Sequence, residues 1–146
     1  METKRIFNGK HDELQSRLVS DFIGNTPFVR LSEKVYAKLE SVNPGGSIKD
    51  RPVKWILDDA EENNLINKGD TIIEATSGNT GIGLAMLCAK LNYELVLTMP
   101  ETMSFERRAL VARYGAQVVI TSGSGDMDGA KQRASEIVEK NENCIE

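Results

Sequence analysis

The fold is decided by residues 71–83, which read Thr71-Ile72-Ile73-Glu74-Ala75-Thr76-Ser77-Gly78-Asn79-Thr80-Gly81-Ile82-Gly83. The first five residues are mostly apolar or β-branched and predict a strand over 71–75. Hydroxyl, amide and glycine residues follow, and they lead into an apolar segment at 84–91 that predicts a helix. A strand joined to a helix by a short loop is the repeating unit of an α/β fold.

The same alternation continues on both sides of this unit. Apolar, β-branched runs predict further strands over residues 35–39, 94–99 and 117–121, and 28–31 could form a short extra strand. The segments between the main strands are long enough for crossover helices, which join parallel strands. Because the runs at 94–99 and 117–121 lack polar alternation, they suit strands covered on both faces. The sequence predicts an α/β fold with a four-stranded, mostly parallel sheet and flanking helices.

Residue types also mark the ends and faces of several helices. Ser104 suits the start of a helix that Gly115 would end. In the last helix, apolar side chains recur at helical spacing and predict one buried stripe, made of Met127, Ala130, Ala134, Ile137 and Val138. One helix face near the N-terminus is predicted by the four-residue steps between Leu14, Leu18 and Phe22.

Composition narrows the class of partner. The chain of 146 residues has 18 Lys+Arg and 22 Asp+Glu, a formal net charge of −4, with 40% hydrophobic and 27% charged residues. This is the composition of a soluble globular protein. The acidic excess, with no basic run longer than Arg107-Arg108, argues against nucleic-acid and membrane partners and favours small molecules. The charged N-terminus and the lack of a long apolar run predict a cytoplasmic protein.

Metal and histidine chemistry are disfavoured by the residue counts. His11 is the only histidine, and the two cysteines, Cys88 and Cys144, form no C-x-x-C pair. A zinc site, a Cys-His nucleophile and a Ser-His-Asp triad are therefore all improbable, and no metal is predicted.

One loop at a strand end contains a lysine with two interpretations. In parallel sheets ligands bind beyond the carboxyl ends of the strands. After the strand at 35–39 comes Asn43-Pro44-Gly45-Gly46-Ser47-Ile48-Lys49-Asp50-Arg51-Pro52, and Pro52 predicts a helix that begins near Lys49. The positive end of a helix favours the neutral, nucleophilic amine, which suits a Schiff-base or proton-transfer lysine. Alternatively, Lys49 is an ordinary surface lysine in a Pro-Gly-Gly turn with Asp50 as the helix cap.

A second loop, at residues 76–83, is rich in hydrogen-bond donors. Its hydroxyl, amide and backbone N–H groups converge on a helix start, where a carboxylate or phosphate could bind. The G-x-x-G-x-G spacing differs from dinucleotide and P-loop motifs, which disfavours NAD and NTP. The alternative is a tightly packed helix start capped by Ser77 or Asn79. The third glycine stretch, residues 122–125, is read as a loop and helix cap because Asp126 and Asp128 would repel an anion.

These motifs together resemble the cysteine synthase and cystathionine β-synthase family, which are pyridoxal-phosphate enzymes of fold type II. The lysine motif lies about thirty residues before Thr76-Ser77-Gly78-Asn79-Thr80-Gly81, as in that family. Roughly residues 23 to 140 are covered, and the further matching segments are Ile23-Gly24-Asn25-Thr26-Pro27, Val35-Tyr36-Ala37-Lys38-Leu39-Glu40, Met99-Pro100-Glu101-Thr102-Met103-Ser104-Phe105-Glu106-Arg107-Arg108 and Tyr114-Gly115-Ala116.

The resemblance implies a role for each residue of the two loops. Lys49 would form the Schiff base with pyridoxal phosphate and later accept the substrate α-proton. Asn79 would bond the cofactor's ring hydroxyl. The substrate carboxylate would be held by Thr76, Ser77, Gly78, Asn79 and Thr80. The implied reaction is β-replacement, in which O-acetylserine and sulfide give cysteine and the cofactor ring acts as electron sink.

The resemblance reaches only the N-terminal half of such enzymes. It implies that the loop binding the cofactor phosphate is absent from this chain. It also implies a small mobile α/β domain at residues 35–146 and a preceding segment, 1–34, that would pack on an absent larger domain. A homo-oligomer or a second polypeptide would then complete the site. Three alternatives follow: an enzyme piece inactive or weak alone, a small enzyme assembled from two chains, and a non-catalytic binding domain.

Overall fold

A computed structural model describes residues 18–141 and 143–146 of the chain. Within these residues the helices and strands follow in the order η1 (Val19–Phe22), β1 (Phe28–Arg30), β2 (Tyr36–Lys38), η2 (Glu40–Val42), α2 (Asp50–Glu62), β3 (Thr71–Ala75), α3 (Asn79–Leu91), β4 (Glu94–Pro100), α4 (Phe105–Arg113), β5 (Gln117–Thr121), η3 (Gly123–Gly125), α5 (Asp126–Glu139) and β6 (Cys144–Ile145). Here η denotes a 3₁₀-helix.

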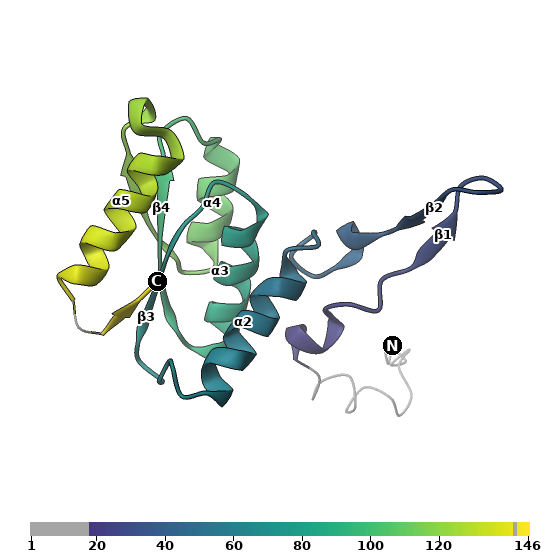
Figure 1. The fold of residues 1–146 in the computed structure, drawn as a ribbon, viewed down its shortest axis with the longest axis horizontal. Coiled ribbons are helices and arrows are strands. Elements are labelled where there is room, and N and C mark those ends of the chain that lie inside the picture. The colour runs from purple at the N-terminus through teal and green to yellow at the C-terminus, as the bar shows by residue number, and fades with distance from the viewer. Residues whose placement is uncertain (1–17, 142) are drawn as a thin grey trace, which may run out of the picture.

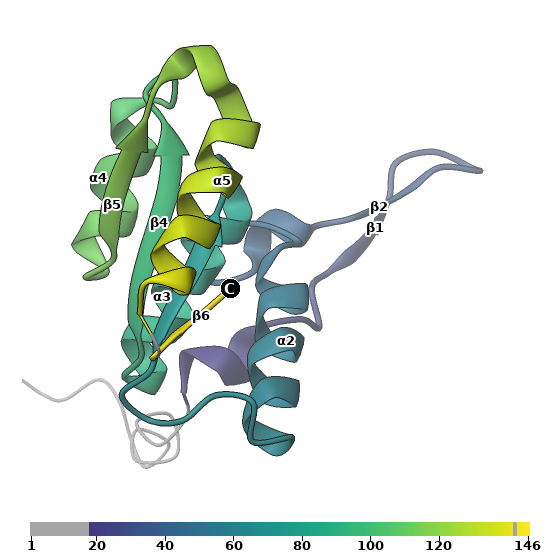
Figure 2. The same ribbon diagram turned by 60° about the vertical axis from the view of Figure 1, so that its left-hand side comes forward.

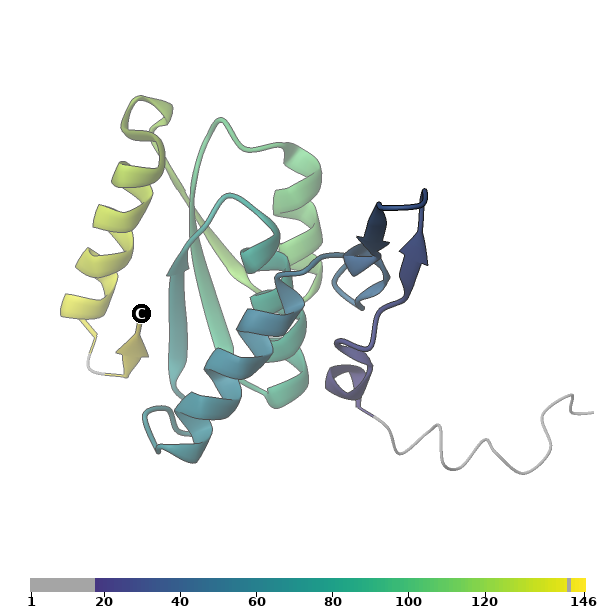
Figure 3. The ribbon, with the colours of Figure 1, turned by 45° about the vertical axis from the view of Figure 1, so that its right-hand side comes forward.

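A four-stranded parallel sheet forms the centre of the molecule, in the order β5-β4-β3-β6. Helices α2, α3 and α4 lie on one side of this sheet and α5 on the other (Figures 1 and 3). The three-layer arrangement confirms the predicted α/β class and the four-stranded sheet. It also explains the apolar strands, because β4 is covered on both faces and all but its first residue are buried.

The membership of the sheet differs from the prediction in one strand. Residues 35–39 were expected to join the parallel sheet, but β2 pairs antiparallel with β1 in a separate two-stranded sheet. A short turn links these two strands, so local pairing is available, and both carry the burial pattern exposed–intermediate–exposed. The fourth strand of the parallel sheet is β6, which pairs with Thr71 and Ile72 of β3.

The β1–β2 hairpin extends away from the three layers (Figures 1 and 3). Phe28 and Tyr36 stack on it with ring centroids 5.3 Å apart, and both rings remain exposed. The expected division of the chain between residues 34 and 35 falls within this hairpin and stays a prediction.

The core lies on both faces of the central strands. On one face, Leu97 of β4 is fully buried in the same cluster as Leu87 of α3, which is 1% exposed. On the other face Ile73 and Val96 pack against Ala134 of α5. Figure 2 shows α5 lying across this face of the sheet. The predicted stripe of α5 is confirmed for four of its five residues, since Ala130 and Ala134 are fully buried and Ile137 and Val138 pack on the core. Met127, at the start of the helix, is only half-buried.

The helix ends agree with the residue types in most places. Ser104 precedes α4 and its hydroxyl accepts a bond from the Arg107 N–H, and Gly115 ends that segment with φ +96°. Ser122 caps η3, while α5 begins without a side-chain cap. The helix face expected from Leu14, Leu18 and Phe22 can be compared with the structure only in part, because Leu14 lies outside the described residues. Of this segment, Val19–Phe22 form a 3₁₀-helix.

Candidate functional site

The two loops singled out in the sequence meet where α2 and α3 begin. We call residues 43–49 the lysine loop and residues 76–80 the glycine loop. A Cβ atom added to Gly83, in the first turns of α3, would lie 3.6 Å from the Lys49 carbonyl oxygen. The lysine loop therefore packs directly on the start of α3, and the glycine loop leads into the same helix.

The lysine loop ends as the sequence predicts. Lys49 is the residue before the first turn of α2, its N–H donates to Ser47 Oγ at 3.1 Å, and its side chain is exposed. Lys49 is exposed, as the alternative interpretation expected, but the assignment of Asp50 as the cap of α2 is wrong. Asp50 is the first residue of the helix, is fully buried, and its Oδ2 accepts the Gly45 N–H at 2.5 Å.

An ion pair joins the start of α2 to the segment before it. Arg51 donates through Nε to Glu40 Oε2 at 2.8 Å and through Nη2 to Oε1 at 2.9 Å. Glu40 also accepts from the Thr26 hydroxyl at 2.8 Å and from the Asn43 amide at 2.8 Å. This two-point pair therefore ties η2, the lysine loop and α2 together.

The charge network makes the stability of this region depend on acid pH. The hydrogen bonds from Arg51 and Thr26 lower the pKa of Glu40 from 4.5 to about 2. Between these pH values the folded chain binds fewer protons at Glu40 than the unfolded chain does. The stabilisation by Glu40 is therefore complete above about pH 4.5 and is lost as the pH falls through about 2.

We expect the free energies of unfolding of the wild-type chain and Glu40→Gln to converge as the pH is lowered from 4.5 towards 2. Urea unfolding at a series of pH values measures this difference. Glu33→Gln, which changes an exposed acid in the hairpin turn, is the control and should show a difference that stays small throughout. A Glu40→Gln difference that stayed constant over the same range would contradict the assignment.

The glycine loop places uncapped backbone N–H groups at the start of α3. Gly78 is the N-cap residue of α3 and makes no side-chain capping bond, so the alternative with Ser77 or Asn79 as cap is wrong. Thr76 is buried, its N–H donates to the Thr98 carbonyl and its hydroxyl accepts from the Gly78 N–H at 3.3 Å. Free N–H groups at the positive end of a helix suit an anion such as a carboxylate.

A glycine is required where α3 approaches β4. A Cβ atom added to Gly81 would lie 2.6 Å from Thr76 Cγ2 and 3.3 Å from Leu97 Cδ1. Such a distance is too short for two carbon atoms, so any larger residue would push the helix away from the loop. This packing requirement accounts for one glycine of the G-x-x-G-x-G spacing. Asn79, the first residue of α3, is exposed.

Sequence reasoning missed several residues that shape these loops. Arg107 of α4 donates through Nη1 to the Ser77 carbonyl at 3.1 Å and so brings a positive charge to the glycine loop. The pair formed by Glu40 and Arg51 and the buried carboxyl of Asp50 were also missed. Arg107 belongs to the only Arg-Arg pair in the sequence, which was the one available signal.

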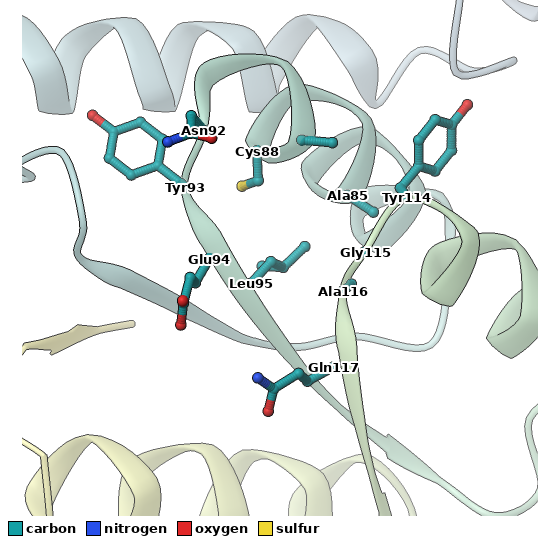
Figure 4. A pocket seen from close by; sticks show the side chains of 11 residues that line it. Ala85, Cys88, Asn92, Tyr93, Glu94, Leu95, Tyr114, Gly115, Ala116 and Gln117 are labelled. Atoms are coloured by element: carbon teal, nitrogen blue, oxygen red, sulfur yellow. The ribbon is translucent and has the colours of Figure 1, made fainter.

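A cavity of about 240 Å³ lies at the other end of the sheet (Figure 4). It is lined by the end of α3, the start of β4 and the start of β5, and includes Cys88, Tyr93 and Tyr114. Burial raises the pKa of the Cys88 thiol to about 12, so this group is not a nucleophile near neutral pH. This cavity therefore offers no thiol nucleophile comparable to the amine of the lysine loop.

Metal and membrane features are absent from the part of the chain that the structure describes. Within residues 18–141 and 143–146 no three His, Cys, Asp or Glu residues cluster as metal ligands, and His11 lies outside these residues. No described helix is both long and apolar enough to span a bilayer. Both cysteines are free thiols.

Comparison with known proteins identifies similar sequences and structures. The sequence model of the family described as "Pyridoxal-phosphate dependent enzyme" matches residues 19–146. A cysteine synthase from Staphylococcus aureus is 50% identical over 129 residues, which are 84% of this chain and 42% of that protein. The chain thus spans about two-fifths of the length of this relative.

Solved structures of two similar proteins superpose on the chain. A cysteine synthase from Entamoeba histolytica has a TM-score of 0.83 at 32% identity, covering 99% of this chain and 44% of its own. An O-acetylserine-dependent cystathionine β-synthase from Helicobacter pylori has a TM-score of 0.81 at 34% identity, covering 87% of this chain and 44% of its own.

Proposed function

Because the chain belongs to the family of pyridoxal-phosphate-dependent enzymes, we propose that it supplies the lysine-bearing part of a cysteine synthase-like site. The proposed reaction is β-replacement: an activated serine such as O-acetylserine loses its β-substituent, and sulfide adds to give cysteine. One observation carries the proposal, the packing of the Lys49 backbone on the start of α3. The names of the relatives from S. aureus and H. pylori support the reaction and the substrate class.

The residues of the two loops fit the reactive end of pyridoxal phosphate. Its aldehyde requires an amine, and Lys49 is an exposed amine at the start of α2. In the glycine loop, the amide of Asn79 is available to the ring hydroxyl of the cofactor. The hydroxyl groups and the uncapped N–H groups are available to a substrate carboxylate. Residues 122–125 suit the cofactor phosphate poorly, because Asp126 and Asp128 stand beside them. We therefore assign the phosphate-binding group to residues outside this chain.

Each residue has a defined part in the proposed chemistry. The cofactor, when bound, supplies an electron-withdrawing ring that stabilises negative charge at the substrate α-carbon. Lys49 would hold the cofactor, and its amine would accept the proton from the substrate α-carbon. Thr76, Ser77, Asn79 and Thr80 would hold the substrate carboxylate through side chains and backbone N–H groups. Gly78, whose own N–H donates to the Thr76 hydroxyl, would let the carboxylate approach the backbone closely. The Asn79 amide would also bond the ring hydroxyl of the cofactor.

The remainder of the site is proposed to come from a second copy or a second polypeptide. The length of the relatives supports this, as do the exposed apolar side chains of the β1–β2 hairpin, among them Phe28 and Leu31 at 67% and 65% exposure. The chain alone would then be inactive or weak. The alternative, a binding domain without catalysis, is disfavoured because both Lys49 and Asn79 are retained. A cytoplasmic location fits the two free thiols.

Covalent capture of the cofactor tests the proposal directly. The chain is incubated with pyridoxal phosphate, reduced with borohydride, weighed intact and digested to locate the adduct. We expect a single adduct on Lys49. Adducts scattered over surface lysines, or none, would overturn the assignment of Lys49. Pyridoxal without phosphate is the companion probe: equal capture of both supports a phosphate site outside this chain, and strong preference for the phosphate contradicts it.

Replacing Asn79 by alanine is expected to weaken capture of pyridoxal phosphate about tenfold, the factor that corresponds to loss of one hydrogen bond. The free energy of unfolding should change by less than about 0.5 kcal/mol, because the side chain is exposed. Dependence of Lys49 modification on cofactor concentration measures the effect. Gln132→Ala, on the exposed surface of α5, is the control. Undiminished capture by a folded Asn79→Ala chain would remove this residue from the site.

A further inference from the structure

Asp50 is a buried carboxyl beside an exposed amine. It is 0% exposed, whereas Lys49 before it is exposed and Arg51 after it is partly exposed. A buried carboxyl loses the solvation of water and is retained only where its surroundings offset that loss. The interpretation of Asp50 as a helix cap does not account for this burial, and neither does the ion pair between Arg51 and Glu40.

The two oxygens of Asp50 have different surroundings. Oδ2 accepts the Gly45 N–H at 2.5 Å and so closes the chain from Gly45 to Asp50 into a ring that includes Lys49. Oδ1 is buried without a hydrogen-bond partner in the part of the chain that the structure describes. A Cβ atom added to Gly45 would lie 2.3 Å from Oδ1, and one added to Gly83 would lie 3.5 Å from it.

The carboxyl therefore lies in a space bounded by two glycines from different elements. Gly45 belongs to the lysine loop and Gly83 to α3, the helix that follows the glycine loop, so Asp50 lies between the lysine loop and α3. A side chain on Gly45 would displace the carboxyl outright. Because Asp50 is bonded to the Gly45 N–H and packed next to Gly83, a shift of Asp50 would move the lysine loop relative to α3.

The charge state of Asp50 is compatible with this enclosed position. Burial raises the pKa of Asp50, the hydrogen bond from Gly45 lowers it, and the negative charge of Glu40 raises it further, with a net increase. A carboxyl that is more readily neutral tolerates an oxygen without a partner better than a fixed anion does.

We propose that Asp50 is a positioning residue for Lys49: its carboxyl holds the lysine loop against the start of α3 and so fixes the position of Lys49 just before α2. This inference rests on the proposed function of Lys49. Asp50 touches neither cofactor nor substrate in this role, and it acts through the backbone of the loop.

Two substitutions of Asp50 separate positioning from charge. Asp50→Asn keeps an oxygen that can accept the Gly45 N–H, and Asp50→Ala removes it. We expect the rate of Lys49 modification by pyridoxal phosphate to fall about tenfold in Asp50→Ala, as for loss of one strong hydrogen bond, and to recover to within about threefold of wild type in Asp50→Asn. Equal rates in Asp50→Ala and wild type would overturn the inference.

Leu57→Ala distinguishes positioning from general destabilisation. Leu57 is 3% exposed on the same helix, away from its start, so its truncation destabilises α2 without touching the lysine loop. We expect Lys49 in Leu57→Ala to react at the wild-type rate under conditions where the chain is folded. A fall equal to that of Asp50→Ala would reduce Asp50 to a general structural role and overturn the inference.

Amide hydrogen exchange gives a readout that needs no cofactor. If wild-type Lys49 is not captured at all, the proposed function fails, yet the inference is still decided by the Gly45 amide. Its exchange, relative to that of Leu97 in the core, should be at least about tenfold faster in Asp50→Ala and unchanged in Leu57→Ala. Unchanged exchange in Asp50→Ala overturns the inference. If Asp50→Ala does not fold, Gly45→Ala makes the same tests, because its Cβ would displace the carboxyl.

Discussion

Lys49→Ala is expected to abolish covalent capture of pyridoxal phosphate at this position, with a loss of at least about 100-fold in the specific adduct. The reason is chemical, because alanine has no amine to condense with the aldehyde. Reaction with other surface lysines remains and sets the background of the measurement. Since the Lys49 side chain is exposed, the free energy of unfolding should stay within about 0.5 kcal/mol of wild type.

Lys54→Ala is the matched control for Lys49→Ala. Lys54 lies on the same helix little more than one turn further on and forms an ion pair with Asp58. Its removal should leave the yield of the Lys49 adduct unchanged, as read by mass spectrometry of the digested chain. Equal loss in both variants, or an unchanged total adduct in Lys49→Ala, would show that capture does not depend on the position at the start of α2.

The sequence was sufficient to predict the central strands and the two loops. β3, β4 and β5 lie where short β-branched runs predicted them, because a strand covered on both faces must be apolar throughout. Proline and glycine positions located the start of α2 and the end of α4. Local chemistry decides these features, so local residue types reveal them.

Other features depend on contacts between distant residues and could not be read from the sequence. β6 has only two residues, too few for a pattern, and it is a strand because β3 offers an open edge. The bonds that Arg51 makes to Glu40 and Thr26 join residues 11 and 25 positions apart. Asp50 reads locally as a surface cap, and only the packing of α2 on α3 encloses it.

Leu97→Ala is expected to lower the free energy of unfolding by about 3 to 5 kcal/mol, the upper range for leucine truncation in a core. Leu97 is 0% exposed, sits at the middle of β4, and its Cδ1 lies within 3.3 Å of the place where Gly81 would carry a Cβ atom. Since surrounding side chains cannot fill the space fully, a cavity remains next to the helix that carries the glycine loop. A loss of this size is a large share of the stability of a small domain.

Ile120→Ala is the control, because Ile120 is an aliphatic residue of the neighbouring strand β5 but is 43% exposed. We expect its truncation to cost less than half as much, as measured by urea unfolding followed by circular dichroism. Equal losses would mean that burial does not distinguish these two positions on the same face of the sheet. If Leu97→Ala is destabilised but folded at low temperature, the cavity beside Gly81 should also weaken capture at Lys49. The same buried leucine would then support both the sheet and the geometry of the glycine loop.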